Sequence, residues 1–259
     1  MSFALISGAS SGIGKEFAYL LAARGYNLVL VSRNGDKLNE VKADIESEFG
    51  VKVVAEPIDL SEVGAAETLF NRITDRGVEI EVLINNAGFG KYGDFLKYDS
   101  DVYERMIVLN TITPTSLMLL FGRKMVERGK GWILNVSSTA ALQPLPYFAV
   151  YSATKSYMLK LSEALYEEFH NKGVSVMALC PGPTKTNFGK TAETVGTKMF
   201  NPAGLADAKF VAEEGLKGLF SGKRVVVCGK FNNILAFLAK IMPDRIVLKI
   251  SSRIMKRKS

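Results

Sequence analysis

The chain has 259 residues, 47% of them apolar, which suits one large α/β domain better than two small ones. Its net charge of +7 is concentrated near the end, because residues 240–259 hold seven Lys or Arg and a single acid, Asp244. The rest of the chain is nearly neutral, which argues against nucleic acid as a partner. His170 is the only histidine, so a histidine-based triad and a multi-histidine metal site are excluded, and we predict no metal site.

Compartment signals are few. No basic stretch precedes the apolar strand that starts at Phe3, and no apolar run approaches the roughly 20 residues of a membrane-spanning helix, so we expect neither a secretory signal nor a spanning segment. Cys180 and Cys228 fall near the ends of two late predicted strands. We predict buried free thiols rather than a disulfide, as in a cytoplasmic protein.

The first predicted elements form an anion site. Residues 3–7 make a short apolar strand, a glycine-rich turn covers 8–14, and an amphipathic run with Phe17, Leu20 and Leu21 follows. Bare backbone can approach a pyrophosphate, and the N-terminus of a helix favours its charge. Glycines also simply make tight turns, which is the alternative. The predicted cofactor contacts here are Ser7, Gly8, Ser10, Ser11, Gly12, Ile13 and Gly14.

The second predicted strand, residues 27–32, ends beside Arg33. An NAD site usually places an acid there to hold the ribose hydroxyls, and Asp36 comes too late to do so. A guanidinium at this point suits a 2′-phosphate, which favours NADP(H); a solvated arginine is the alternative.

Helical and strand patterns then alternate along the chain. The predicted helices are 36–49, 62–76, 101–126, 151–172 and 206–220, and the predicted strands are 51–57, 82–85, 131–136, 174–180 and 224–228. This alternation predicts an α/β fold with a doubly wound parallel sheet that carries helices on both faces.

Polar residues follow the third and fourth strands. Asp59 and Leu60 lie at the edge where α/β sheets bind ligands, although an aspartate before Ser61 also suits a helix cap. The fourth strand closes with the sequence Asn86, Ala87, Gly88, for which a tight turn is a sufficient structural reason.

We place the chemistry between residues 134 and 155. A strand ends in Ser137 and Ser138, and a later helix opens with Tyr151 and Lys155 one turn apart on the same face. A phenol titrates near 10, and a lysine charge about 4 Å away at an effective dielectric of about 20 supplies roughly 4 kcal/mol, enough to lower that pKa by about three units. We therefore predict a lysine-tuned tyrosine acid.

Two other segments attract attention. The predicted helix 101–126 contains Asn110 and then Pro114, and a proline inside a helix bends it. Asn110 near such a disturbance can hold a water or cap a freed carbonyl.

Residues 185–205 have few periodic apolar positions, and a loop this long in a compact domain is usually functional. We predict a substrate lid there, with a plain surface loop as the alternative.

Taken in order, these residues resemble the short-chain dehydrogenase/reductase family. The family's patterns are a glycine-rich cofactor turn, an Asn-Ala-Gly turn, a helix asparagine, an active serine, Tyr-x-x-x-Lys and Pro-Gly-x-x-x-Thr. The matching positions are Ser7, Gly8, Gly12, Gly14, Asn86, Ala87, Gly88, Asn110, Ser138, Tyr151, Lys155, Pro181, Gly182 and Thr186. Ser7 replaces the family's threonine but keeps its hydroxyl. The resemblance covers residues 3 to about 228.

The resemblance implies a seven-stranded Rossmann sheet and NADPH-dependent reduction of a ketone or aldehyde. Tyr151 would protonate the carbonyl oxygen, Ser138 would bind that oxygen, Lys155 would lower the tyrosine pKa and bind the nicotinamide ribose, and Asn110 would hold a proton-relay water. Homodimers or homotetramers through the helices of Asn110 and Tyr151 are also implied. Further implied cofactor contacts are Asp59, Leu60, Asn86, Ala87, Pro181, Gly182, Thr184 and Thr186.

We divide the chain into a Rossmann domain, 1–230, and a basic amphipathic tail, 231–259. The tail suits an anionic membrane surface, a cover over an apolar pocket, or a second subunit. Our hypothesis is that tail and lid together shelter an apolar ketone of acyl-chain or steroid type. Two alternatives to an enzyme are a non-catalytic NADP(H) sensor and a membrane-surface or nucleic-acid adaptor that uses the tail.

Overall fold

The computed structural model describes residues 2–197 and 204–256. Its strands are β1 (Phe3–Ser7), β2 (Asn27–Ser32), β3 (Val53–Pro57), β4 (Ile80–Asn85), β5 (Gly131–Val136), β6 (Val174–Cys180) and β7 (Val225–Val227). They form one sheet of order β3-β2-β1-β4-β5-β6-β7 in which every pairing is parallel. The prediction of a seven-stranded doubly wound sheet is confirmed. The strand order reverses between β1 and β4, so a ligand crevice is expected at their carboxyl ends.

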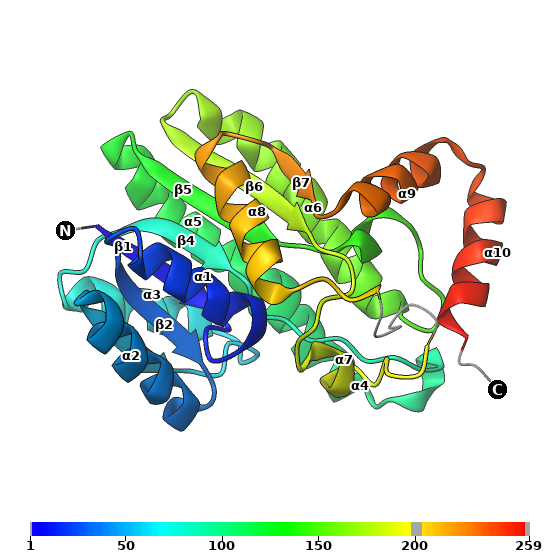
Figure 1. The fold of residues 1–259 in the computed structure, drawn as a ribbon, viewed down its shortest axis with the longest axis horizontal. Helices are drawn as coiled ribbons and strands as arrows, with labels where there is room; N and C mark the ends of the chain where they lie inside the picture. The colour runs from blue at the N-terminus through cyan, green and yellow to red at the C-terminus, as the bar shows by residue number, and fades with distance from the viewer. Residues whose placement is uncertain (1, 198–203, 257–259) are drawn as a thin grey trace.

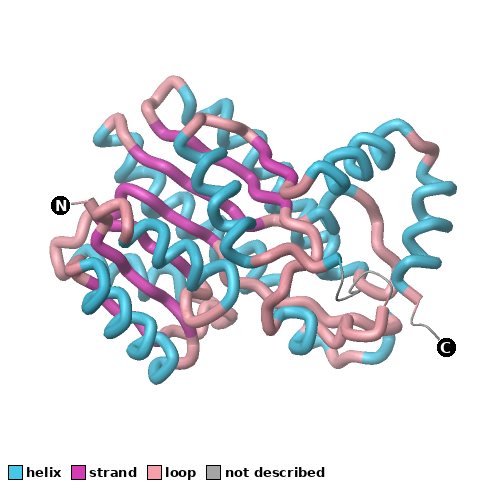
Figure 2. Tube along the Cα trace, viewed as in Figure 1, coloured by secondary structure: helices cyan, strands magenta, loops and turns pink. Residues whose placement is uncertain are grey.

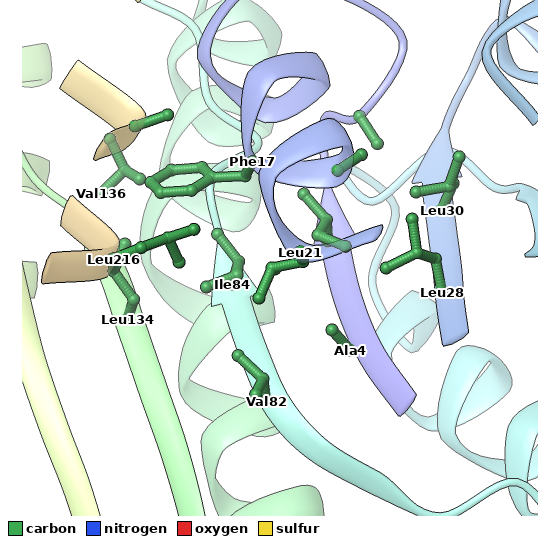
Figure 3. Packing of buried hydrophobic residues seen from close by; sticks show 14 of the residues in the cluster. Ala4, Phe17, Leu21, Leu28, Leu30, Val82, Ile84, Leu134, Val136 and Leu216 are labelled. Carbon is green, nitrogen blue, oxygen red and sulfur yellow. The ribbon is translucent and has the colours of Figure 1, made fainter. Parts of the chain in front are cut away.

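Helices cover both faces of the sheet, as Figures 1 and 2 show. One face carries α1 (Gly12–Ala22), α2 (Gly35–Phe49) and α8 (Ala208–Phe220), and the other carries α3 (Ala65–Asp75), α5 (Thr113–Arg128) and α6 (Ala149–His170). Alternate residues of β1 enter the two cores, Ile6 one and Leu5 the other, as the two-residue period of a strand requires. Figure 3 shows Phe17 and Leu21 of α1 packed over the first core.

The predicted helix 101–126 differs in detail from the helix observed. It consists of α4 (Ser100–Ile107), a π turn (Val108–Ile112) and α5, with Pro114 in the first turn of α5. The disturbance around Asn110 is thus a π turn, which lies directly before Pro114. This helical run is also long and apolar enough to cross a membrane by length and composition, contrary to our expectation, but 56% of its most apolar window is buried, as in a core helix.

The remaining described elements lie around the carboxyl edge of the sheet and beyond β7. They are the 3₁₀ turns η1 (Phe95–Lys97) and η3 (Thr139–Leu142), and the helices α7 (Phe188–Thr191), α9 (Lys230–Ile241) and α10 (Asp244–Met255). Helix α7 lies within the predicted lid, of which residues 198–203 are outside the described residues. The tail forms α9 and α10, which extend away from the sheet (Figure 1).

Both cysteines are buried and free. Burial raises the pKa of Cys180 to about 12, against a smaller opposing effect of a hydrogen bond with Ser137. Burial also raises the pKa of Cys228 to about 12, and the neighbouring Cys180 adds to this rise. Both thiols therefore stay protonated and unreactive at neutral pH.

Candidate active site

The carboxyl ends of the strands open onto a cavity of about 370 Å³. The predicted site residues on its wall are Gly8, Ser10, Ser11, Gly12, Ile13, Arg33, Asp59, Leu60, Asn86, Ala87, Gly88, Ser138, Tyr151, Lys155, Pro181, Gly182, Thr184 and Thr186. Three others, Ser7, Gly14 and Asn110, are buried and do not line this cavity. No group of three or more His, Cys, Asp or Glu within the described ranges could hold a metal ion.

The glycine-rich turn between β1 and α1 has no room for a side chain at Gly8 or Gly12. Gly8 and Gly12 have φ of +69° and +56°, in the left-handed region that favours glycine. A Cβ on Gly8 would lie 2.8 Å from Asn86 Nδ2, and one on Gly12 would lie 2.9 Å from Thr186 Cγ2. The N-cap Ser11 makes no side-chain capping bond, and the first turn of α1 contains no acid. The first N–H groups of α1 are therefore left for an anion such as a pyrophosphate.

Ser7 and Asn86 tie this turn to the end of β4. The Ser7 hydroxyl accepts hydrogen bonds from the backbone N–H groups of Asn86 (2.9 Å) and Ala87 (3.0 Å) and donates to the Ile84 carbonyl (3.3 Å). Asn86 Nδ2 donates to the Ser7 carbonyl at 2.9 Å. These two side chains shape the cavity wall by joining the ends of the two central strands.

Arg33 stands at the end of β2, and its side chain is 65% exposed. Its Nη1 lies 3.9 Å from Asp59 Oδ2, which also pairs with Arg105 Nη2 at 2.8 Å. Burial opposes ionisation of Asp59, but hydrogen bonds from Ser61 and the charges of Arg33 and Arg105 hold its pKa below the usual value. The helix-cap alternative for Asp59 is wrong, because α3 begins only at Ala65 with Gly64 as its N-cap.

Tyr151 lies in the first turn of α6 and is only 7% exposed. Its ring stacks on Phe148, with ring centres 4.4 Å apart, and contacts Phe188 at 5.3 Å. Burial raises the pKa of Tyr151, while its hydrogen bond with Ser138 acts in the opposite direction. The phenol therefore keeps its proton at neutral pH.

The charge of Lys155 does not bring the pKa of Tyr151 close to 7, which is what we predicted. Its Nζ donates to the carbonyl of Val136 at 2.8 Å and lies 5.7 Å from the centre of the Tyr151 ring. Burial lowers the pKa of Lys155 to about 8, so the ammonium is still mostly charged at neutral pH. The prediction of a tyrosine pKa brought close to 7 is wrong for this structure, because burial of the phenol raises its pKa and the hydrogen bond with Ser138 opposes this rise only in part.

Ser138 lies opposite Tyr151 at the end of β5 and accepts a hydrogen bond from the Ala140 N–H at 3.0 Å. A hydroxyl has a single proton, and this contact leaves it for donation towards the oxygen of Tyr151 or an oxygen placed beside it. Ser137, beside it, donates to the Lys155 carbonyl at 2.7 Å and so fixes α6 against β5. The strand end thus positions both the serine and the helix that carries Tyr151.

Asn110 is buried in the π turn, and its side chain holds two segments together. Its Nδ2 donates to the Phe89 carbonyl (2.9 Å) and to Thr154 Oγ1 (3.0 Å), and its Oδ1 accepts from the Phe89 N–H (3.1 Å). Pro114 has no N–H to offer the Asn110 carbonyl four residues earlier. A second cavity of about 10 Å³, the size of one water molecule, is lined by Asn110 and Lys155. Sequence reasoning missed Thr154, whose partner lies 44 residues away.

Gly90 and the aromatic residues of the wall were also missed. A Cβ on Gly90 would lie 2.6 Å from Phe148 Cζ and 2.9 Å from Tyr151 Cδ2. Phe89, Phe148 and Phe188 line the cavity around the tyrosine. Phe148 could have been predicted, because it is an aromatic residue only three positions before Tyr151. Nothing in the local sequence indicates that Gly90 contacts either ring.

The described part of the predicted lid is fastened beside the cavity. Phe188 of α7 lines the cavity, and Glu193 accepts hydrogen bonds from Lys91 Nζ (2.8 Å), Lys97 Nζ (2.9 Å) and Tyr98 Oη (3.0 Å). The bonds from Lys91 and Lys97 lower the pKa of Glu193 to about 2. An ion-pair cluster thus holds this segment on the loop that follows β4.

The tail, unlike the predicted lid, does not lie on the wall of the cavity. Among the described residues, none of α9 or α10 lines the cavity. Met255, at the end of α10, is fully buried in the same apolar cluster as Tyr92 and Tyr151. Phe188 of α7 thus lines the cavity and the described part of the tail does not, while our hypothesis that tail and lid jointly shelter a substrate stays a prediction.

The sheet and its cavity define a Rossmann-type fold with a site shaped for a nucleotide. A protein-family comparison is more specific: the family described as short chain dehydrogenase matches residues 2–195, and the chain belongs to that family. The resemblance found in the sequence is confirmed.

Curated relatives are reductases of acyl chains by name. The chain is 35% identical over 194 residues to a human very-long-chain 3-oxoacyl-CoA reductase, a match that covers 73% of this chain and 61% of the relative. It is 36% identical over 213 residues to the corresponding Caenorhabditis elegans protein, covering 80% of this chain and 66% of that one. The chain thus spans less than two thirds of the length of these relatives.

Solved structures match over nearly the whole chain. A short-chain dehydrogenase from Sphingobium yanoikuyae in complex with NADPH superposes with a TM-score of 0.82 at 29% identity, covering 94% of this chain and 97% of that one. A 7beta-hydroxysteroid dehydrogenase superposes with a TM-score of 0.87 at 26% identity, covering 96% of each chain.

Proposed function

We propose that this protein is an NADPH-dependent reductase that converts an apolar ketone or aldehyde into an alcohol. One observation carries the proposal: Tyr151 and Ser138 lie on the wall of the same cavity as the glycine-rich turn, which contributes Gly8, Ser10, Ser11, Gly12 and Ile13. A proton donor and an anion cradle in one cavity are what hydride transfer from a dinucleotide to a carbonyl requires.

The residues present fit NADP(H). The turn around Gly8 and Gly12 leaves no space for a Cβ, so bare backbone faces the cavity, and α1 directs its uncapped N-terminus there. Arg33 is mostly exposed at the end of β2, where a guanidinium can bind a 2′-phosphate. The relative from Sphingobium yanoikuyae is described with NADPH. When bound, this cofactor supplies the hydride.

The chain's own residues would handle the proton. Because burial raises the pKa of Tyr151, the phenol is protonated at neutral pH and can give its proton to the carbonyl oxygen. Ser138 donates its hydroxyl proton in a hydrogen bond to the same oxygen and holds it in place. The ammonium of Lys155, 5.7 Å from the ring centre, stabilises the charge left on the phenolate. An acid that holds its proton at pH 7 suits reduction.

The substrate side of the cavity is apolar. Phe89, Phe148 and Phe188 surround the tyrosine, and three aromatic rings favour a carbonyl carried on an apolar body. Curated relatives are named 3-oxoacyl-CoA reductases, which makes an acyl-chain carbonyl the first candidate. A steroid carbonyl is the second, on the likeness to a 7beta-hydroxysteroid dehydrogenase.

The test is NADPH and NADH oxidation measured against acyl-thioester, steroid, aliphatic and sugar carbonyls. We expect turnover with NADPH and an acyl chain or steroid, and a loss of about 10²–10⁴ in rate in Tyr151→Phe, the range of one general acid. Tyr166→Phe, on the same helix but away from the cavity, is the matched control and should react like the wild type. Wild-type turnover in Tyr151→Phe would disprove the role of the phenol.

Assembly and location belong to the same proposal. We infer a homodimer or homotetramer through α5 and α6, which expose Leu119 and Tyr157 and meet where Tyr157 Oη lies 3.2 Å from Thr115 Oγ1. Light scattering of the wild type and of Leu119→Glu tests this, and an unchanged mass would contradict it. The two buried free thiols support a cytoplasmic setting.

A further inference from the structure

Helices α9 and α10 expose most of their large apolar side chains. In α9, Phe231 is 71% exposed, and Phe237 and Ile241 are each 62% exposed. The other exposed apolar side chains of the two helices are Ile234, Leu235, Leu238, Ile246, Leu248, Ile250 and Ile254. Soluble monomers rarely expose apolar residues at this density, and such a patch usually marks an interaction site.

Helix α9 is attached to the domain by its polar and small residues. Asn232 Nδ2 donates to the Cys228 carbonyl and Asn233 Nδ2 to the Val227 carbonyl, both at 2.7 Å. Ala236 is its one buried apolar side chain among those described. This is the reverse of an ordinary amphipathic helix, which turns its apolar face inward. The large apolar residues of α9 are therefore not core residues.

Helix α10 has three stripes. Val247, Ser251 and Met255 are buried at intervals of four and face the domain. By helical periodicity, Ile246, Ile250 and Ile254 form a neighbouring exposed stripe, and Arg245, Lys249, Arg253 and Lys256 form a basic stripe beyond it. An apolar stripe beside a basic one is the arrangement of a helix that lies in a lipid interface.

The charge of the tail indicates which kind of partner its exposed surface binds. Arg245, Lys249, Arg253 and Lys256 are all exposed, so the surface complements an anionic partner. In an isologous pair of two copies, this basic face would meet itself, and like charges would repel. The described part of the tail contributes no residue to the cavity lining, which favours an external partner over a role as a pocket cover.

The surface has a defined position on the molecule. Met255 is fully buried, and its carbonyl accepts a hydrogen bond from Tyr92 Oη at 2.5 Å. Tyr92 and Met255 belong to the apolar cluster that contains Tyr151. The end of α10 is thus fixed to the part of the domain that holds the tyrosine.

We propose that α9 and α10 form a docking surface for an anionic lipid bilayer. Phe231, Phe237 and Ile241 enter the headgroup region, and Lys249 and Arg253 bind anionic headgroups. Docking places the side of the domain that carries Tyr151 next to the membrane. The proposal does not rest on the proposed catalytic function, because binding is measured without turnover.

The experiment is co-sedimentation of the full chain with vesicles of phosphatidylcholine alone and of phosphatidylcholine mixed with phosphatidylserine. We expect binding to the mixed vesicles that weakens as salt is raised. The double variant Lys249→Gln, Arg253→Gln should bind about 25-fold more weakly, at about fivefold for each basic residue near the surface. The matched control replaces two exposed lysines of α8, Lys209→Gln with Lys217→Gln, and should bind like the wild type.

A second pair of variants tests the apolar contribution. Phe231→Ser with Phe237→Ser should reduce vesicle binding, whereas Val63→Ser, at a residue 82% exposed on another part of the domain, should not. All these positions are exposed, so unchanged thermal unfolding verifies that the variants are folded.

Three outcomes would overturn the proposal. The wild type could remain in the supernatant with phosphatidylserine vesicles. The tail variants could bind as tightly as the wild type. The tail variants could also dissociate an oligomer while vesicle binding is unchanged, which would make a second copy of the chain the occupant.

Discussion

Replacing Ser7 with alanine tests whether one buried hydroxyl holds the cofactor turn together. Ser7 is 2% exposed and does not reach the cavity. Its hydroxyl accepts hydrogen bonds from the N–H groups of Asn86 at 2.9 Å and Ala87 at 3.0 Å. In Ser7→Ala both amides lose their acceptor, and the Ile84 carbonyl loses a donor.

The magnitude follows from these contacts. A buried donor left without a partner costs about 1–3 kcal/mol. Asn86 and Ala87 are only partly buried, so we take the lower half of that range, about 1–2 kcal/mol for each amide and about 2–4 kcal/mol in total. A domain has about 5–15 kcal/mol of stability, so this loss is large enough to measure. Because Asn86 and Ala87 line the cavity, NADPH binding should weaken as well.

The assay is urea unfolding followed by circular dichroism, with NADPH affinity measured by fluorescence. The matched variant is Ser7→Thr, which keeps the hydroxyl and should retain most of the stability and affinity. The reasoning is refuted if Ser7→Ala unfolds within about 0.5 kcal/mol of the wild type, the usual effect of a change that removes no special contact. It is also refuted if Ser7→Thr is as unstable as Ser7→Ala.

The other predictions concern Lys155, Glu193 and Gly90. Burial lowers the pKa of Lys155 from its ordinary 10.5 to about 8. Between these two pH values the unfolded chain binds more protons than the folded chain, so the contribution of this group to stability rises with pH. Unfolding of Lys155→Met measured over this range should lack the rise, and an identical pH dependence would contradict the assignment. With the pKa of Glu193 lowered to about 2, its contribution to stability is present above its ordinary 4.5 and is lost as pH falls towards 2. Glu193→Gln should therefore show faster amide hydrogen exchange over residues 185–197 at neutral pH, and exchange equal to the wild type would count against the ion-pair cluster. Gly90→Ala should lower kcat at least tenfold with little change in NADPH affinity, because a Cβ would lie 2.9 Å from the Tyr151 ring, and an unaltered kcat would show that the ring adapts.

Local sequence patterns were sufficient for most of the sheet. The strands 3–7, 27–32, 131–136 and 174–180 have the same bounds in the structure as in the prediction. Each is a short apolar run bounded by glycine or polar turn residues, a signal that depends only on neighbours in the chain. Because parallel strands end at one edge, the residues after them were predicted to meet, and 18 of the predicted site residues line one cavity.

Burial and long-range hydrogen bonds decided what the sequence did not. The spacing of Tyr151 and Lys155 is local, but the tyrosine pKa depends on the aromatic residues packed around the phenol. The ammonium of Lys155 binds the carbonyl of Val136, 19 residues away. Asn110 was visible in the sequence, but its partner Thr154 comes from another helix.

The tail shows the same division. The sequence by itself determined that residues 231–256 are apolar and basic with helical periodicity, because that pattern is local. Only the tertiary structure decided which side of each helix contacts the domain. Asn232 and Asn233 bind carbonyls near β7, so the apolar side of α9 faces outward. For α10 the deciding contact is distant in the chain, because the hydroxyl of Tyr92 donates a hydrogen bond to the carbonyl of Met255, 163 residues later, and amino-acid order alone does not specify that contact.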